Sequence, residues 1–171
     1  QFHDIYIINL ETGERRQIKE KSPSYMRFSP KGKYTYWYQD QDSSWYTRST
    51  ADGKEYRLTT PQTFAAWDED NDVPDYPSPY GIAGWTDDDQ SILIKDRYDI
   101  WKFDPIAASS PVNLTVNGRK EQITYSLIQL DREKRAYNTS EAQYLTGFNE
   151  RTKGSGYYTT RLNKPVAPKA L

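Results

Sequence analysis

The chain has 171 residues, of which 23 are Lys or Arg and 24 are Asp or Glu, with a formal net charge of −1 and a pI of about 5.9. This length predicts one domain, and the balanced charge excludes the basic surface of a nucleic-acid-binding protein. Because there is no cysteine, we expect no disulfide and no thiolate metal site. No apolar run approaches the ~20 residues of a membrane helix, so we expect no membrane partner. We also expect no cofactor and no nucleic-acid partner.

Aromatic residues dominate the apolar content. Hydrophobic residues make up 35% of the chain and aromatic residues 15%, including 15 Tyr and 5 Trp, while the mean hydropathy is −0.99. Large rings bury much area and keep a polar edge in water. The composition therefore predicts a folded, β-rich protein with a core built from aromatic side chains.

The first part of the chain alternates short β-prone runs with polar turns. Residues 5–9 and 15–18 predict a hairpin around a turn that contains Gly13. A four-strand module follows, in which a Ser-Pro-Lys-Gly turn joins the first two strands. Its expected strands are residues 25–28, 34–38, 45–48 and 56–59.

Two further modules have the same pattern. The first has an apolar run at residues 92–94, an alternating run at 100–103 and a closing segment at 112–114. The second begins at residue 127. Its later strands are expected at 144–148, 157–162 and 170–171, and residues 139–143 are compatible with a short helix.

The modules form a repeat. Trp45 precedes Leu58 by 13 positions, and the same spacing separates Trp101 from Leu114 and Tyr158 from Leu171, while Tyr6 precedes Ile18 by 12. We therefore predict an all-β fold, a partial β-propeller of about three and a half four-stranded antiparallel blades. The whole of 1–171 would belong to one propeller domain. The expected blade modules are 4–18 (partial), 25–60, 82–115 and 127–171.

Insertions lengthen the later repeats. Trp45, Trp101 and Tyr158 are 56 and 57 residues apart, whereas propeller blades have about 40 to 50 residues. Residues 61–80, 116–124 and 132–143 are the expected insertions. The four aromatic anchors suggest a stacking platform for sugars or bases, but their placement of one per blade favours a core between blades. The three aspartates 87–89 are interpreted as a hairpin turn.

Residues 28–33, 85–90 and 97–105 resemble the propeller repeats of the prolyl oligopeptidase family of serine peptidases, with the dipeptidyl- and acylaminoacyl-peptidase branches nearest. The Ser-Pro-x-Gly turn also resembles TolB-type propellers. The peptidase resemblance implies a propeller that filters peptide substrates for an α/β-hydrolase domain, and a bacterial periplasmic location. It covers essentially the whole chain.

The chain departs from that family where catalysis is concerned. The nucleophile elbow Gly-x-Ser-x-Gly is absent, because Gly154-Ser155-Gly156 lacks the outer frame. His3 is the sole histidine, so a Ser-His-Asp triad cannot be assembled. We therefore expect a non-catalytic segment whose partners are a hydrolase domain of the same parent chain and a peptide substrate.

The acidic part of the first insertion is the candidate site. Its five carboxylates are Asp68, Glu69, Asp70, Asp72 and Asp75. A calcium loop fails in detail, since Val73 replaces the required Gly and Pro79 the bidentate Glu. The dipeptidyl-peptidase resemblance implies instead that Asp68, Glu69 and Asp70 bind the amino group of a substrate. A solvated insertion loop is the remaining alternative.

Three functions remain open from the sequence. The first is the substrate-gating propeller segment described above, the second a TolB-like propeller that binds a protein partner, and the third a carbohydrate-binding propeller. Part of a ring leaves two terminal blades uncovered. We therefore also expect self-association through exposed blade edges.

Overall fold

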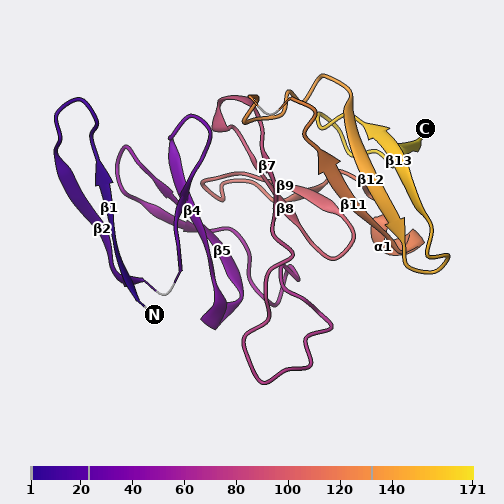
Figure 1. Cartoon of the computed structure of the whole chain (residues 1–171), viewed down its shortest axis with the longest axis horizontal. Coiled ribbons are helices and arrows are strands. Elements are labelled where there is room, and N and C mark those ends of the chain that lie inside the picture. Colours follow the sequence, from indigo (N-terminus) through magenta and orange to yellow (C-terminus); the bar gives the residue numbers. More distant parts are fainter. Residues whose placement is uncertain (1, 23, 132) are drawn as a thin grey trace.

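The computed structural model describes residues 2–22, 24–131 and 133–171, and in these ranges the chain forms four antiparallel sheets. The all-β prediction is confirmed. The sheets follow one another in chain order, with the two termini at opposite ends of the molecule (Figure 1). Two predicted segments reach outside the described residues, namely the domain range at Gln1 and the insertion 132–143 at Arg132.

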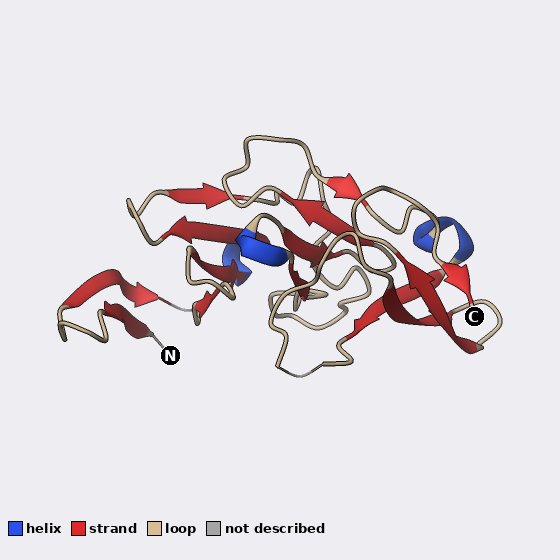
Figure 2. Ribbon diagram, turned by 90° about the horizontal axis from the view of Figure 1, so that it is seen from above, coloured by secondary structure: helices blue, strands red, loops and turns tan. Residues whose placement is uncertain are grey.

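The first sheet is a two-stranded hairpin of β1 (His3–Ile8) and β2 (Arg15–Ser22). Gly13 has a φ of 73° in the connecting turn, a conformation that glycine adopts at no steric cost. The hairpin lies at one end of the molecule (Figure 2). The Lys19 ammonium group lies 4.3 Å from the Trp37 ring centroid and so joins the hairpin to the second sheet.

The second sheet contains four strands in sequential order and corresponds to the predicted module 25–60. It consists of β3 (Arg27–Phe28), β4 (Tyr34–Gln39), β5 (Ser44–Ser49) and β6 (Glu55–Arg57). A short 3-10 turn, η1 (Asp40–Asp42), joins β4 to β5. The predicted turn before β4 is confirmed, since the Gly32 amide donates to the Ser29 carbonyl at 2.9 Å.

The third sheet repeats this meander within the predicted module 82–115. It consists of β7 (Ile82–Trp85), β8 (Ile92–Lys95), β9 (Ile100–Phe103) and β10 (Val112–Asn113). The turn η2 (Asp87–Asp89) joins β7 to β8, which confirms the interpretation of the three aspartates as a hairpin turn.

The fourth sheet starts earlier than the module 127–171 predicted from sequence. It consists of β11 (Ile123–Ile128), β12 (Gln143–Asn149), β13 (Ser155–Thr160) and β14 (Lys169–Ala170). The prediction of a short helix within 139–143 was wrong, because residues 139–140 form a turn and residue 143 already pairs in β12. One helical turn, α1 (Gly118–Glu121), instead precedes β11 in the insertion 116–124.

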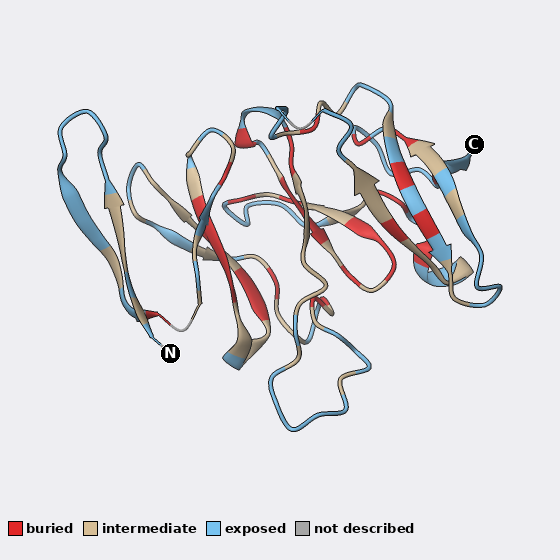
Figure 3. Cartoon of the chain, viewed as in Figure 1, coloured by how far each residue is buried: buried red, intermediate tan, exposed pale blue. Residues whose placement is uncertain are grey.

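Two hydrophobic cores lie between the three four-stranded sheets and hold neighbouring sheets together. The first contains Tyr36 and Trp45 of the second sheet and Ile92 and Ile94 of the third. The second contains Leu93 of the third sheet together with residues of the fourth. Because β8 is buried on both faces, its sequence is a continuous apolar run rather than an alternating one. Buried residues are concentrated accordingly in the middle of the stack (Figure 3).

The aromatic anchors have different degrees of burial. Trp45 belongs to the first core, and Trp101 packs against it. Tyr158 packs against the second core, whereas Tyr6 lies under the Arg15 guanidinium group, 3.6 Å from its carbon. The predicted core role is therefore confirmed for the three anchors of the four-stranded sheets.

The closing positions repeat in the backbone but not in burial. The amide of Leu58 donates to the Trp45 carbonyl at 2.9 Å, and the amide of Leu171 donates to the Tyr157 carbonyl at 3.0 Å. Leu171 is nevertheless 75% exposed, and Leu162 is fully buried in its stead. The spacing therefore predicted where each repeat closes but not which leucine enters the core.

Asp89 connects the second and third sheets. Its carboxylate is buried, with 2% of the residue exposed, and it accepts hydrogen bonds from the Ser29 hydroxyl and, at 3.1 Å, from the amides of Lys31 and Lys33. A turn residue of one sheet thus satisfies the backbone donors of the preceding sheet's turn. Charge-assisted bonds of this kind are about twice as strong as neutral ones.

We expect Asp89→Asn to lower the free energy of unfolding by about 1–3 kcal/mol, because an amide supplies one acceptor oxygen to donors that now share two. Asn also tolerates the positive φ of 56° at this position, so the loss would report the carboxylate. Denaturant unfolding measures it, with the exposed Asp87→Asn of the same turn as control. Equal stability of the two variants would contradict the connection.

Candidate functional site

The acidic insertion 61–80 is a long loop between β6 and β7, and it extends away from the sheets (Figure 1). Its base is closed by backbone bonds, in which the Asp68 amide donates to the Ser78 carbonyl at 2.8 Å and the Tyr80 amide to the Ala66 carbonyl at 2.9 Å. Phe64 and Ala66 lie in the first core. The sheets therefore hold the base of the loop firmly and present its acidic tip.

The three residues predicted to bind an amine follow directly from the closed base, and this segment, residues 68–70, is the acidic tip. The Asp68 carboxylate accepts the amide of Asp70 at 3.1 Å, and the Glu69 amide donates to the Tyr80 hydroxyl at 2.8 Å. The side chains of Glu69 and Asp70 each meet an arginine from another part of the chain. The amine-binding role of Asp68, Glu69 and Asp70 stays a prediction. An ammonium group bound here would share the carboxylates of Glu69 and Asp70 with the two arginines.

Arg97, in the turn between β8 and β9, binds two carboxylates. Its guanidinium group lies 2.8 Å from the Asp70 carboxylate, and two of its nitrogens lie 3.2 and 3.3 Å from the Glu150 carboxylate. The Tyr98 hydroxyl donates to Glu150 at 2.8 Å. Hydrogen bonds to Asp70 and Glu150 raise the pKa of Arg97, so this centre is permanently charged. Arg97 thus joins the acidic loop to the end of β12.

Arg119, in α1, forms the second link to the loop. Two of its nitrogens lie 2.9 and 3.3 Å from the two oxygens of Glu69, a bidentate arrangement. The same guanidinium group lies 3.7 Å from the Asp96 carboxylate. The guanidinium carbons of Arg97 and Arg119 lie 5.3 and 5.2 Å from the centroid of the Tyr98 ring. Cation–π contacts therefore add to both ion pairs.

Two buried aspartates position these arginines. Asp96 accepts the amides of Tyr98 and Asp99 at 2.8 and 2.6 Å and the Trp101 indole N–H at 3.1 Å. Burial raises the pKa of the Asp96 carboxyl group, and the amide bonds offset only part of that effect. These bonds fix the turn from which Arg97 projects.

Asp99 holds the start of α1. Its carboxylate accepts the Thr115 hydroxyl at 2.6 Å and the amides of Gly118 and Arg119 at 2.9 and 3.1 Å. A Cβ atom at Gly118 would lie 2.6 Å from an Asp99 oxygen, so only glycine allows this approach. The backbone of Arg119 is thereby fixed relative to the β8–β9 turn.

Sequence reasoning found the acidic half of this site and missed the basic half. The stretch 97–105 was noted for its resemblance only, and Arg119 and Glu150 were not singled out. A signal was present, because Arg119 falls in a predicted insertion, where binding residues tend to gather. Pairing across 27 to 53 residues of sequence, however, cannot be deduced without the fold.

No family model matches the chain, and a search of curated proteins finds no significant match. Within 2–22, 24–131 and 133–171, no helix is long and apolar enough to cross a membrane. In the same ranges, no group of three or more His, Cys, Asp or Glu side chains is arranged to hold a metal ion. The assignment of function therefore rests on this chain's own residues.

We expect Arg97→Gln and Arg119→Gln to loosen the acidic loop. Each variant removes an ion pair that joins residues 69–70 to the sheets. Losing the free energy of one exposed ion pair increases local opening of the loop roughly two- to five-fold. Hydrogen–deuterium exchange of the amides in 68–75 measures the effect. Lys120→Gln, beside Arg119 and paired only with its neighbour Glu121 among the described residues, is the matched control. Unchanged exchange in both arginine variants would contradict the two links.

Glu150 predicts a pH dependence. Partial burial alone would raise its pKa, but hydrogen bonds from Tyr98 and Arg97 outweigh burial and hold the pKa below the ordinary value of 4.5. A lowered pKa means that the ionised group stabilises the fold above pH 4.5, and that this contribution is lost as the pH falls through the folded-state pKa.

The stability difference between the unaltered chain and Glu150→Gln should therefore be largest near pH 7 and shrink below pH 4.5. Urea unfolding across this range measures it. Glu11→Gln, in the exposed turn of the first hairpin, is the control. A difference that stays constant with pH would refute the pairing of Glu150 with Arg97 and Tyr98.

Proposed function

We propose that the chain is a segment of a β-propeller in which each four-stranded sheet is one blade and the β1–β2 hairpin is half of another. The supporting observation is that three consecutive four-stranded meanders share one strand order and pack against their sequence neighbours through two cores. Stacking of sequential repeats on each other is how propellers bury their blade faces.

Within this proposal, the chain is a non-catalytic, substrate-gating part of a hydrolase of the prolyl oligopeptidase type. The family resemblance of residues 28–33 and 97–105 supports it. The sole histidine, His3, lies on β1 with its ring centroid 4.5 Å from that of Tyr25, and among the described residues its imidazole forms no hydrogen bond to a serine hydroxyl or a carboxylate. A hydrolase domain of the same parent chain would perform the chemistry.

The acidic tip supplies a specific gating role. Asp68, Glu69 and Asp70 lie on an insertion that the two arginines hold in a fixed position. A loop positioned in this way would present carboxylates to the free amino group of a peptide, and charge-assisted hydrogen bonds would retain it. Asp68 is the member of the three that forms no ion pair among the described residues, so it would make the first contact.

A second candidate is a TolB-like propeller that binds a protein partner. One face of the fourth sheet favours it, because Tyr144, Phe148 and Tyr157 are 39%, 41% and 65% exposed on strands whose other face is buried. Aromatic side chains of this kind are enriched at protein interfaces. A second copy of the chain would be the simplest partner for such a face.

One experiment separates the two candidates. The complete reading frame that encodes this chain should also encode Gly-x-Ser-x-Gly, followed by Asp and His, and its product should react with a fluorophosphonate probe for activated serines. The 171-residue chain alone should not react. A complete product without the motif and the reaction would overturn the peptidase proposal, and labelling of the 171-residue chain would overturn its non-catalytic role.

A further inference from the structure

A pocket of about 500 Å³ lies between the second sheet and the start of the third, beside Pro79 near the end of the acidic insertion. Its walls include Tyr36, Tyr38 and Trp45 from the second sheet, and Pro79 and Ile82 from the approach to β7 and β7 itself. Pockets that bind small organic ligands have volumes of about 300–1,000 Å³ and mainly apolar walls with a few polar groups. This pocket has both properties.

The aromatic walls are closely packed. Tyr36, Tyr38 and Trp45 are each more than nine-tenths buried, and their rings contact one another, with centroids 6.4 Å apart for Tyr36 and Trp45 and 5.3 Å for Tyr38 and Trp45. The indole N–H of Trp45 has no hydrogen-bond acceptor among the described residues. A buried donor without a partner is unfavourable.

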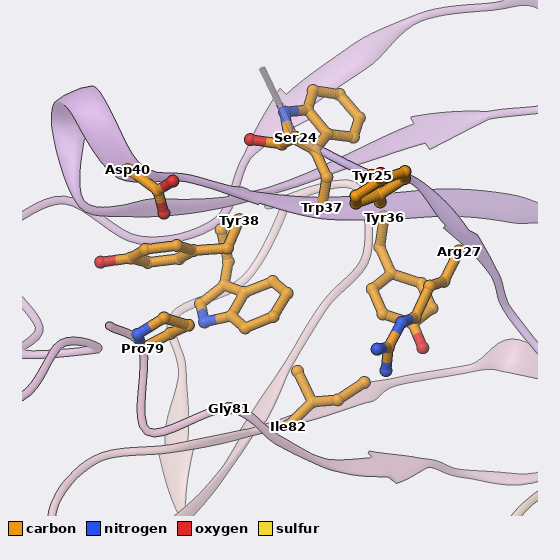
Figure 4. A pocket seen from close by; sticks show the side chains of 11 residues that line it. Ser24, Tyr25, Arg27, Tyr36, Trp37, Tyr38, Asp40, Pro79, Gly81 and Ile82 are labelled. Carbon is orange, nitrogen blue, oxygen red and sulfur yellow. The ribbon is translucent and has the colours of Figure 1, made fainter. Parts of the chain in front are cut away.

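Opposite charges stand on the two sides of the pocket. Figure 4 shows the Asp40 carboxyl group beside Tyr38 on one side and the Arg27 guanidinium group beside Tyr36 on the other. In the part of the chain that the structure describes, neither Arg27 nor Asp40 forms an ion pair, in contrast to Arg97 and Arg119. Burial and the charge of Asp75 raise the pKa of Asp40, an effect that a cation in the pocket would reverse.

The spacing of the two charges selects the length of a ligand. Arg27 pairs with Tyr36 across the sheet, and Asp40 follows Tyr36 by four positions, which in a strand corresponds to roughly 13 Å. This backbone separation exceeds the length of a single extended amino acid. An extended peptide spans at most about 3.3–3.6 Å per residue, so two or three residues, together with the reach of the Arg27 and Asp40 side chains, fill the distance.

We propose that this pocket binds a free-ended di- or tripeptide with an apolar side chain. Its amino terminus would pair with Asp40 and its carboxylate with Arg27, whose planar fork of donors matches a carboxylate. The apolar side chain would lie against Tyr36 and Trp45. The proposal is independent of the peptidase function, because the binding requires no hydrolase domain.

The test is isothermal titration of the chain with Ala-Leu-Ala, carried out beside its N-acetylated and its C-amidated forms. The free-ended peptide should bind saturably, and each blocked form should bind about ten-fold more weakly, as expected for loss of one charge-assisted hydrogen bond. Because the blocked peptides are tested on the unaltered chain, this comparison does not depend on the folding of any variant.

Two variants assign the ends. Asp40→Asn should weaken the free-ended peptide about ten-fold and leave the N-acetylated form unaffected, and Arg27→Gln should do the same with the C-amidated form. Asp52→Asn and Lys31→Gln, which alter exposed residues outside the pocket, should change nothing. Absence of saturable binding, or equal binding of free and blocked peptides, would overturn the proposal. Peptide binding by the 171-residue chain without any peptidase in the complete reading frame would uphold this site and reject only the peptidase function.

Discussion

The fold depends on the burial of β8 between two neighbouring sheets. Ile92 and Ile94 enter the first core, and Leu93 enters the second, so one short strand contributes to both interfaces. Only 35% of the residues are hydrophobic. One aliphatic strand in the middle sheet that serves both cores therefore makes efficient use of few apolar side chains. The outer sheets contribute aromatic rings to these cores, Tyr36 and Trp45 from the second sheet and Tyr125 from the fourth.

Carboxylates perform the second structural task, which is to fix the turns between strands. Three buried aspartates accept backbone amides. Asp96 binds amides of its own turn, whereas Asp89 and Asp99 bind amides of other turns. A buried carboxylate is unfavourable unless it is fully hydrogen-bonded. The need to satisfy these carboxylates therefore fixes the backbone conformation of the turns that bind them. The two arginines that hold the acidic tip project from the segments that Asp96 and Asp99 fix. Function at the tip would therefore depend on residues that touch no ligand.

The sequence determined the strands better than their surroundings. The spacing between aromatic anchors and closing leucines predicted the repeat. The turns predicted the hairpins within each repeat, because the length of a turn sets which strand residues pair. Burial of Leu162 in place of Leu171 was not predictable, because it depends on how the last loop returns to the core. The start of β11 at Ile123 was missed because Ile123 and Thr124, which pair with β12, fall within the predicted insertion 116–124.

The candidate site divides in the same way. Local composition identified Asp68, Glu69 and Asp70, but their partners Arg97 and Arg119 come from turns distant in sequence. Asp89 was correctly predicted to lie in a turn, yet its bonds to Lys31 and Lys33 cross from one sheet to the next. Contacts between repeats are set by packing, and packing is not visible in a single repeat.

The packing of the sheets in chain order is the central claim, and it is tested most directly by nuclear Overhauser effects in a methyl-labelled sample. Leu93 and Leu114 of the third module share the second core with Leu145 and Leu162 of the fourth. We expect methyl–methyl cross-peaks between these two pairs of leucines, and none from either pair to the exposed methyl groups of Leu10. Sharp spectra without cross-peaks between the third and fourth modules would contradict the account.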